Sequence, residues 1–181
     1  HMIRLRHANQ IDDREANEVI LLNSHDGTSS YQMLAGMLRF VCSNGLVCGD
    51  TVADVRVRHK GQIVDNVIEG AYAVLQGFSR VREDRDAMRA VTLSGEEAMA
   101  FGRAALALKY ELLAPRRHAD MGSDLWSTFN RVQENMVRGG LDAQTTNGRR
   151  QRTREIRGID QSVKVNRALW VLAEEMRKLK A

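Results

Sequence analysis

The first third of the chain carries apolar and polar residues in patterns that are typical of strands. Residues 3–7 alternate apolar and basic side chains, and residues 18–23 form an apolar run of strand length. The polar stretch 11–17 reads as a turn, so we expect the two strands to pair as a hairpin. Residues 46–48 and 51–58 also read as extended, the second with Asp54, Arg56 and Arg58 on its outer face.

Residues 31–41 admit two interpretations. Leu34, Met37, Leu38 and Val41 are spaced as one face of a helix, and this spacing favours a helix over the alternative, a strand. Residues 43–45, with the sequence Ser-Asn-Gly, end the element in either case.

From residue 61 onward the hydrophobic period becomes helical. One stripe predicts a helix of about five turns that packs on the sheet, with the polar residues 79–89 continuing it in part. The stripe consists of Val64, Ile68, Ala71, Leu75 and Phe78, flanked by Ile63, Val67 and Tyr72.

Three further helices are predicted, each with recognisable end signals. Ser94 and Glu97 match a capping box in front of a helix that carries Phe101. Ser123 or Asp124 caps the next helix, which Gly139 and Gly140 stop. That helix carries Trp126, Phe129, Val132 and Met136; the last helix begins near Asp160 or Ser162 and carries Val165, Leu169, Leu172 and Met176.

Strands therefore come first and helices follow, without the alternation of a βαβ unit. This order predicts an α+β fold, a small and mainly antiparallel sheet packed against helices, followed by a helical C-terminal part. We expect residues 1–110 to form the sheet-plus-helix core and residues 111–181 an arginine-rich helical part on the same domain.

Composition narrows the class of protein. The chain has 181 residues, 43% hydrophobic and 28% charged, which is globular composition. No apolar run reaches about 18 residues, so we expect no membrane partner. Cys42 and Cys48 are too few for a disulfide scaffold, and with no secretory signal they indicate reduced thiols and a cytoplasmic protein.

Charged residues are distributed unevenly along the chain, and most of the basic ones are arginine. The net charge is +4, from 27 basic residues, of which 22 are Arg, and 23 acidic residues. Residues 1–115 carry a net −2 and residues 116–181 a net +6, and residues 147–157 hold five Arg against one Glu. Arginine pairs bidentately with phosphate and stacks on bases, so this run favours a nucleic-acid partner. The alternatives are a solvated loop in a protein from a GC-rich genome, where codon use favours Arg over Lys, and a surface for an acidic protein.

The candidate nucleic-acid-binding residues form three groups. The first is the run itself, the second would extend it, and the third is a basic strip on a predicted strand that Arg4 and Arg6 join if the strands are neighbours. The groups are Arg149, Arg150, Arg152, Arg154 and Arg157; Arg116, Arg117, Lys164 and Arg167; and Arg56, Arg58 and Lys60. Only 5% of residues are aromatic, which argues for backbone contact and against a base-stacking platform.

Signals for catalysis or a cofactor are weak. His25 and Asp26 are better explained as an Asx-type turn than as partners of Cys42 and Cys48 in a zinc or nucleophile site. Residues 45–50 lack the Gly-Lys-Ser/Thr ending of a P-loop. We therefore expect a non-enzymatic protein with no metal and no cofactor.

Three stretches resemble a known family. They are LLNSHDGTSSYQ at 21–32, RFVCSNGLVCG at 39–49, and DLWST with RVQEN at 124–128 and 131–135. They resemble a domain-of-unknown-function family found on plasmids and prophages, often beside anti-restriction genes, and the likeness runs through nearly the whole chain. The resemblance implies a mobile element and the bacterial cytoplasm, but no established activity. Relatives have a substantial segment before Ile3 and a longer loop near Tyr110, so we expect residues to be missing here.

A looser resemblance, of topology alone, is to ring-forming single-strand annealing proteins of recombination. It implies single-stranded DNA as the favoured partner and a possible homo-oligomer. The expected function is thus single-stranded DNA binding or annealing by a mobile-element protein. The alternative is a protein-interaction factor with an anti-restriction or anti-defence role and a host protein as partner.

Overall fold

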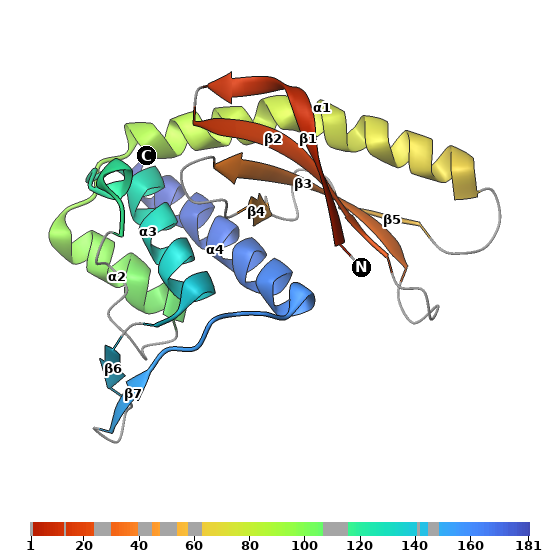
Figure 1. The fold of residues 1–181 in the computed structure, drawn as a ribbon. Coiled ribbons are helices and arrows are strands. Elements are labelled where there is room, and N and C mark those ends of the chain that lie inside the picture. Colours follow the sequence, from red (N-terminus) through yellow and green to blue (C-terminus); the bar gives the residue numbers. More distant parts are fainter. Residues whose placement is uncertain are drawn as a thin grey trace. The chain divides into compact units, whose positions relative to one another are not determined.

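The computed structural model describes residues 2–12, 14–23, 30–39, 45–47, 54–57, 63–106, 116–140, 142–144 and 149–181. Within these residues, five strands precede the first helix, and a short hairpin interrupts the helical remainder (Figure 1). The chain divides into two compact units, residues 1–83 and residues 84–181. The α+β prediction with a helical C-terminal part is confirmed. The division expected after residue 110 stays a prediction.

The first unit is built on a five-stranded sheet in which every pairing is antiparallel. Its strands are β1 (Met2–Asp12), β2 (Glu15–Leu22), β3 (Tyr31–Arg39), β4 (Gly45–Val47) and β5 (Asp54–Val57). β2 lies between β1 and β3, and β4 and β5 pair with successive stretches of the far edge of β3. The predicted hairpin is present, with a turn confined to the residues between Asp12 and Glu15.

The helix favoured for residues 31–41 is wrong, because residues 31–39 form the central strand β3. Met33, Leu34, Ala35 and Met37 are all 0–1% exposed, so both faces of this strand are buried. A strand buried on both faces reads as a continuous apolar run, and some of its positions then fall on helical spacing by coincidence.

Helix α1 (Ile63–Ala90) contains the five turns that its apolar stripe predicts and continues through all of the polar residues 79–89, which were predicted to continue it in part. Its residues 63–83 belong to the first unit, where the ring of Phe78 meets His7 of β1 edge to face at 5.5 Å. The buried stripe differs from the predicted one and consists of Gly70, Val74, Phe78 and Val81. The predicted stripe is wrong at Val64, Ile68, Tyr72 and Leu75, which are 71%, 49%, 64% and 39% exposed.

The second unit packs helices around a cluster of three aromatic rings. Its helices are α2 (Gly95–Leu106), the 3₁₀ turn η1 (His118–Asp120), α3 (Leu125–Arg138) and α4 (Ile159–Lys180). Trp126 stacks on Phe129 at 5.4 Å, and Trp170 of α4 meets both rings edge-on at 6.3 and 6.1 Å. All three rings are at most 3% exposed, so they form the core of this unit.

The predicted end signals of these helices are also confirmed. Glu97 accepts from the Ser94 N–H at 2.8 Å, and its own N–H donates to the Ser94 hydroxyl at 3.2 Å, which completes the capping box of α2. Asp124 caps α3 by accepting from the Ser127 N–H at 2.9 Å. Gly139 follows α3 at a positive φ of 58°, which favours glycine.

Polar side chains are buried among the apolar ones where α3 and α4 meet. Gln133 donates to the Asn166 side-chain oxygen at 3.0 Å, and Asn166 donates to the Ser162 carbonyl at 2.8 Å. Both amides are 1% exposed. Further along α4, the Trp170 indole N–H donates to Glu174 at 3.0 Å. The helix interface therefore contains one directed hydrogen bond between the helices, from Gln133 to Asn166, as well as apolar packing, while the other two bonds lie within α4.

Candidate nucleic-acid interface

A two-stranded hairpin carries most of the predicted arginine run. Its strands are β6 (Asp142–Gln144) and β7 (Arg150–Arg152), paired antiparallel with Gln144 opposite Arg150. An extended segment then leads from β7 to α4. We call residues 149–157 the arginine arm. The arm holds Arg149, Arg150, Arg152, Arg154 and Arg157, and all five side chains are exposed.

The arm is fixed to the C-terminal end of α3 by main-chain hydrogen bonds. The Gly140 N–H donates to the Thr153 carbonyl at 2.8 Å, and the Ile156 N–H donates to the Val137 carbonyl at 2.9 Å. The Arg152 Nε adds a bond to the Gly140 carbonyl at 3.0 Å. Hydrogen bonds from both sides of Arg154 thus tie the extended backbone to a buried helix, while the side chains stay outside.

Gly139 permits this close approach. A Cβ at this position would lie 2.4 Å from the Arg154 carbonyl carbon and 2.6 Å from the Glu155 nitrogen. Carbon atoms that are not bonded stay well beyond such distances, so no side chain fits without a shift of the backbone. The glycine predicted only as a helix stop therefore also seats the arm.

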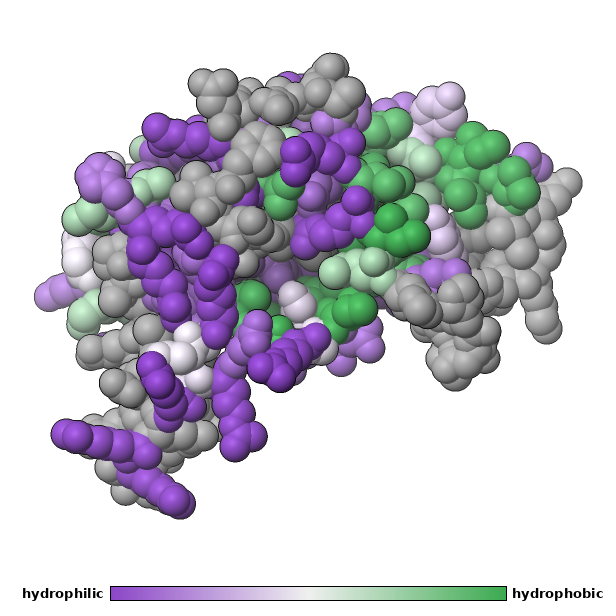
Figure 2. Space-filling view, in the orientation of Figure 1, coloured by the Kyte–Doolittle hydropathy of each residue, from purple (hydrophilic) through white to green (hydrophobic). Residues whose placement is uncertain are grey.

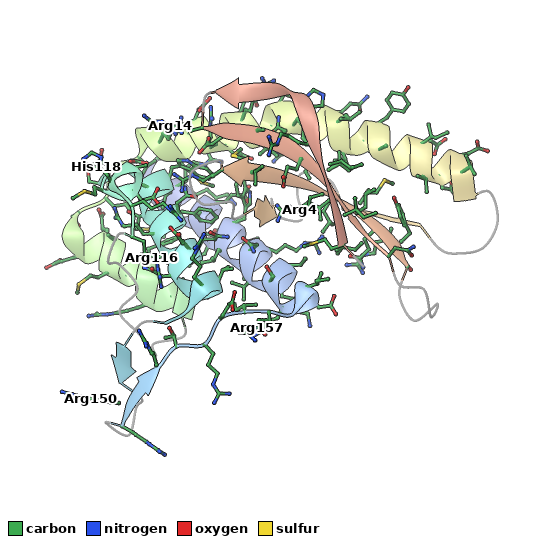
Figure 3. All side chains as sticks on the ribbon, viewed as in Figure 1. Arg4, Arg14, Arg116, His118, Arg150 and Arg157 are labelled. Atoms are coloured by element: carbon green, nitrogen blue, oxygen red, sulfur yellow. The ribbon has the colours of Figure 1, made fainter. Side chains whose placement is uncertain are left out.

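The arm carries little opposing charge of its own. Its one acidic residue, Glu155, pairs with the Arg157 Nε at 3.1 Å, and both side chains are exposed, 54% and 86%. Such exposed pairs are weak and yield readily to another anion. Figure 2 shows hydrophilic side chains along the hairpin, and Figure 3 shows Arg150 directed outward from it. The arm is thus a basic surface open to solvent.

Arg116 and Arg117, predicted to extend the patch, are held against α3. The Arg116 Nε donates to the Asn135 side chain, and its Nη2 donates to the Gly139 carbonyl, each at 2.5 Å. Arg117 pairs with Glu134 at 2.8 Å. Both arginines therefore have a structural role at the C-terminal end of α3, which sequence reasoning missed because Asn135 and Glu134 were not considered as their partners.

Glu134 is the buried centre of that arrangement. Its side chain is 3% exposed and accepts from Arg138 at 3.1 Å as well as from Arg117. A buried carboxylate needs such partners, since an unpaired charge there would be costly. The two cations share one anion, so this end of α3 keeps a positive excess beside the point where the arm is anchored.

Arg131 fixes the segment that precedes α3. Its Nη1 donates to the Asp120 and Gly122 carbonyls, both at 2.6 Å. Burial lowers the pKa of Arg131 from its ordinary value, and the charges of Asp120 and Asp124 oppose that shift. This arginine therefore stabilises the segment before α3 within the second unit and does not belong to the basic surface.

The remaining candidate nucleic-acid-binding residues are less well placed to form one basic surface. Lys164 is exposed in α4, and Arg167 is half-buried one turn further on. Arg4, Arg6 and Arg56 share one face of the sheet, but the pairing of β5 with β3 puts two strands between them. Ile20 and Leu34 lie between these arginines on that face and are buried, so the predicted basic groove is not continuous.

Several predicted features lie outside the described residues: Arg58, Lys60, Cys42, Cys48, His25 and Asp26. In the part of the chain that the structure describes, no three His, Cys, Asp or Glu side chains gather as a metal site requires. Within the same ranges, every helix is too short or too polar to traverse a bilayer.

Comparisons with known proteins identify the family of this chain. Residues 1–170 match the model of the domain of unknown function DUF932. The UPF0380 proteins YfjQ and YafZ of Escherichia coli (strain K12) are 52% and 51% identical over 186 residues, which cover 97% of this chain and 68% of each relative. No solved structure matches at a significant level. On this sequence evidence the chain belongs to the DUF932 family.

Proposed function

We propose that the chain is a non-enzymatic nucleic-acid-binding protein, with single-stranded DNA as its favoured partner. One observation carries the proposal: five exposed arginines lie on a nine-residue arm whose backbone is anchored to α3. Phosphate contacts supply most of the sequence-independent affinity of nucleic-acid binding, and arginine is suited to them.

The form of the arm supports a single strand as ligand. Arg150 and Arg152 lie two residues apart on β7, so they share one face of the hairpin at a spacing of about 6.6 Å. Arg154 and Arg157 continue the charge along an extended backbone. A linear array of cations follows a flexible strand, whose backbone adapts to it. Anchoring reduces the ordering that binding would otherwise require.

The test is fluorescence anisotropy of a labelled oligonucleotide of 30 nucleotides across a salt series. Five phosphate contacts on a single strand correspond to a log–log slope of affinity against salt of about −3.5. The double variant Arg150→Gln/Arg154→Gln should bring that slope to roughly −2, because two contacts are lost.

A matched control removes the same charge elsewhere. Arg82 and Arg103 are exposed on α1 and α2, so Arg82→Gln/Arg103→Gln changes the net charge equally and leaves the arm intact. Equal losses in the two double variants would refute the arm as the binding site, and absence of binding at 50 mM salt would refute the function. Binding of polyglutamate but not of DNA would favour the alternative, an acidic protein partner.

A further inference from the structure

An apolar surface spans the first strand and the first helix of the sheet unit. Two of its side chains belong to β1 and the others to the N-terminal half of α1, where Figure 2 shows hydrophobic side chains gathered. They are Ile3 (55% exposed), Leu5 (50%), Val64 (71%), Ile68 (49%), Tyr72 (64%) and Leu75 (39%). Contiguous exposed apolar patches of this kind mark interaction surfaces.

The helical part of this surface lies on the side of α1 nearest β1. With about 3.6 residues per turn, Val64, Ile68 and Leu75 form a second stripe beside the buried one. Phe78 lies at the edge of the buried stripe that is nearest the exposed one, and Phe78 is the residue that contacts His7 of β1. The end of the exposed stripe at Leu75, one turn before Phe78, therefore lies near the strand that carries Ile3 and Leu5.

β1 is also a sheet edge. It pairs with β2 on one side, and among the described residues no strand pairs with its other side. Every second residue of such an edge directs its N–H and C=O groups outward, which invites another strand. The apolar surface and the open edge are thus neighbours, and one partner can satisfy both.

We propose that this surface binds a second copy of the same chain through antiparallel pairing of the two β1 strands. With a two-fold axis perpendicular to the sheet at Arg4, Ile3 of each copy lies opposite Leu5 of the other. Ile3 and Leu5, the exposed apolar residues on one face of β1, are then covered at once, and the two α1 helices lie on the same face with their exposed stripes toward each other. Such an interface is isologous, as in most dimers.

Charge and area agree with this pairing. The axis brings the two Arg4 side chains together, but each pairs with Glu18 of its own sheet at 2.6 Å, so the charges are already balanced. The six residues are 39–71% exposed, and a pairing that covered all of them fully would bury roughly 1,300 Å² in a dimer, at the lower end of the range of stable interfaces. The inference does not depend on nucleic-acid binding.

Light scattering after size-exclusion chromatography of the whole chain tests the proposal. At 100 µM we expect twice the monomer mass of 20.4 kDa, with dissociation on dilution. Leu5→Lys places a charge on the paired edge, and Ile68→Lys places one on the exposed stripe of α1. Each should raise the dimer dissociation constant at least tenfold, with circular dichroism confirming that the variant is folded.

Leu179→Lys is the control, because Leu179 is 82% exposed in the second unit and belongs to no part of the surface. It should leave the dissociation constant unchanged. A wild-type monomer at 100 µM would overturn the proposal. So would a dimer that persists in the folded Ile68→Lys variant, since its interface would then lie elsewhere.

Discussion

Replacing Gly139 with alanine tests how closely the arginine arm is held to α3. Gly139 has φ 58° and ψ −154°, a backbone conformation that is populated almost exclusively by glycine. The new Cβ would also lie 2.4 Å from the Arg154 carbonyl carbon. Because the atoms in the way are backbone atoms, no side-chain rotation relieves the contact, and the arm has to move.

The magnitude follows from these two effects. A non-glycine residue in this conformation costs about 1–3 kcal/mol. Movement of the arm weakens the Gly140–Thr153 and Ile156–Val137 hydrogen bonds, each of which contributes about 0.5–1.5 kcal/mol net. Since the shift relieves part of the strain as it breaks the bonds, we expect the free energy of unfolding to fall by roughly 2–4 kcal/mol.

Urea denaturation followed by circular dichroism measures the loss, and hydrogen exchange at the Gly140 and Ile156 amides reports whether the arm has detached. Gly140→Ala is the control: Gly140 also has a positive φ, 79°, but its Cβ would meet nothing within 4 Å. If Gly139→Ala costs no more than Gly140→Ala, or if both amides keep their protection, the close seating of the arm is refuted.

Three further outcomes follow from hydrogen bonds in the second unit. Ser94→Ala removes the cap of α2 and should cost about 1 kcal/mol in urea denaturation; an unchanged midpoint would contradict the capping box. Hydrogen bonds from Lys180, and then from the Ser94 N–H, lower the pKa of Glu97 below 4.5. The contribution of Glu97 to stability is therefore complete above pH 4.5 and is lost as the pH falls through the lowered value. Glu97→Gln should therefore flatten the decline of the unfolding temperature in acid, and a decline as steep as in the wild type would count against this assignment. Glu134→Gln leaves Arg117 without its anion and should lower the free energy of unfolding by about 1–3 kcal/mol, less than for a fully buried pair because the arginine is partly exposed. A loss within experimental error would show that water replaces the carboxylate as the partner of Arg117.

Local end signals of helices were predictable because each depends on residues close in sequence. The Ser94–Glu97 capping box, the Asp124 cap and the Gly139 stop were all identified from spacing alone, and the structure contains each one. The strands of the first hairpin were equally accessible, since residues 3–7 alternate apolar and basic side chains and residues 18–23 form an apolar run of strand length.

Burial by distant parts of the chain was not predictable in this way. Met33, Leu34 and Met37 lie in a strand covered on both faces, so the sequence contained no alternation to detect. In α1, apolar residues surround much of the helix, and spacing could not decide whether Val64 or Val74 faces the sheet. Only the packing of the first unit selects the Val74 stripe.

The charge of the candidate site was predictable from the sequence, but its geometry was not. The run around Arg150 was evident from composition, whereas β7 was not, because a three-residue polar strand has no hydrophobic period. The structural role of Arg117 depends on Glu134, which is seventeen residues away and buried. A charge map cannot distinguish an arginine that is available to a ligand from one already bound to a carboxylate.

The buried amide pair between α3 and α4 constrains how this family can change. The Gln133 side chain donates a hydrogen bond to Asn166 at 3.0 Å, so an apolar replacement of either residue alone leaves the other amide without this partner. Simultaneous replacement of both avoids that penalty. The two positions are therefore expected to vary together across homologous sequences, and single changes at either position should be rarer than at the apolar sites beside them.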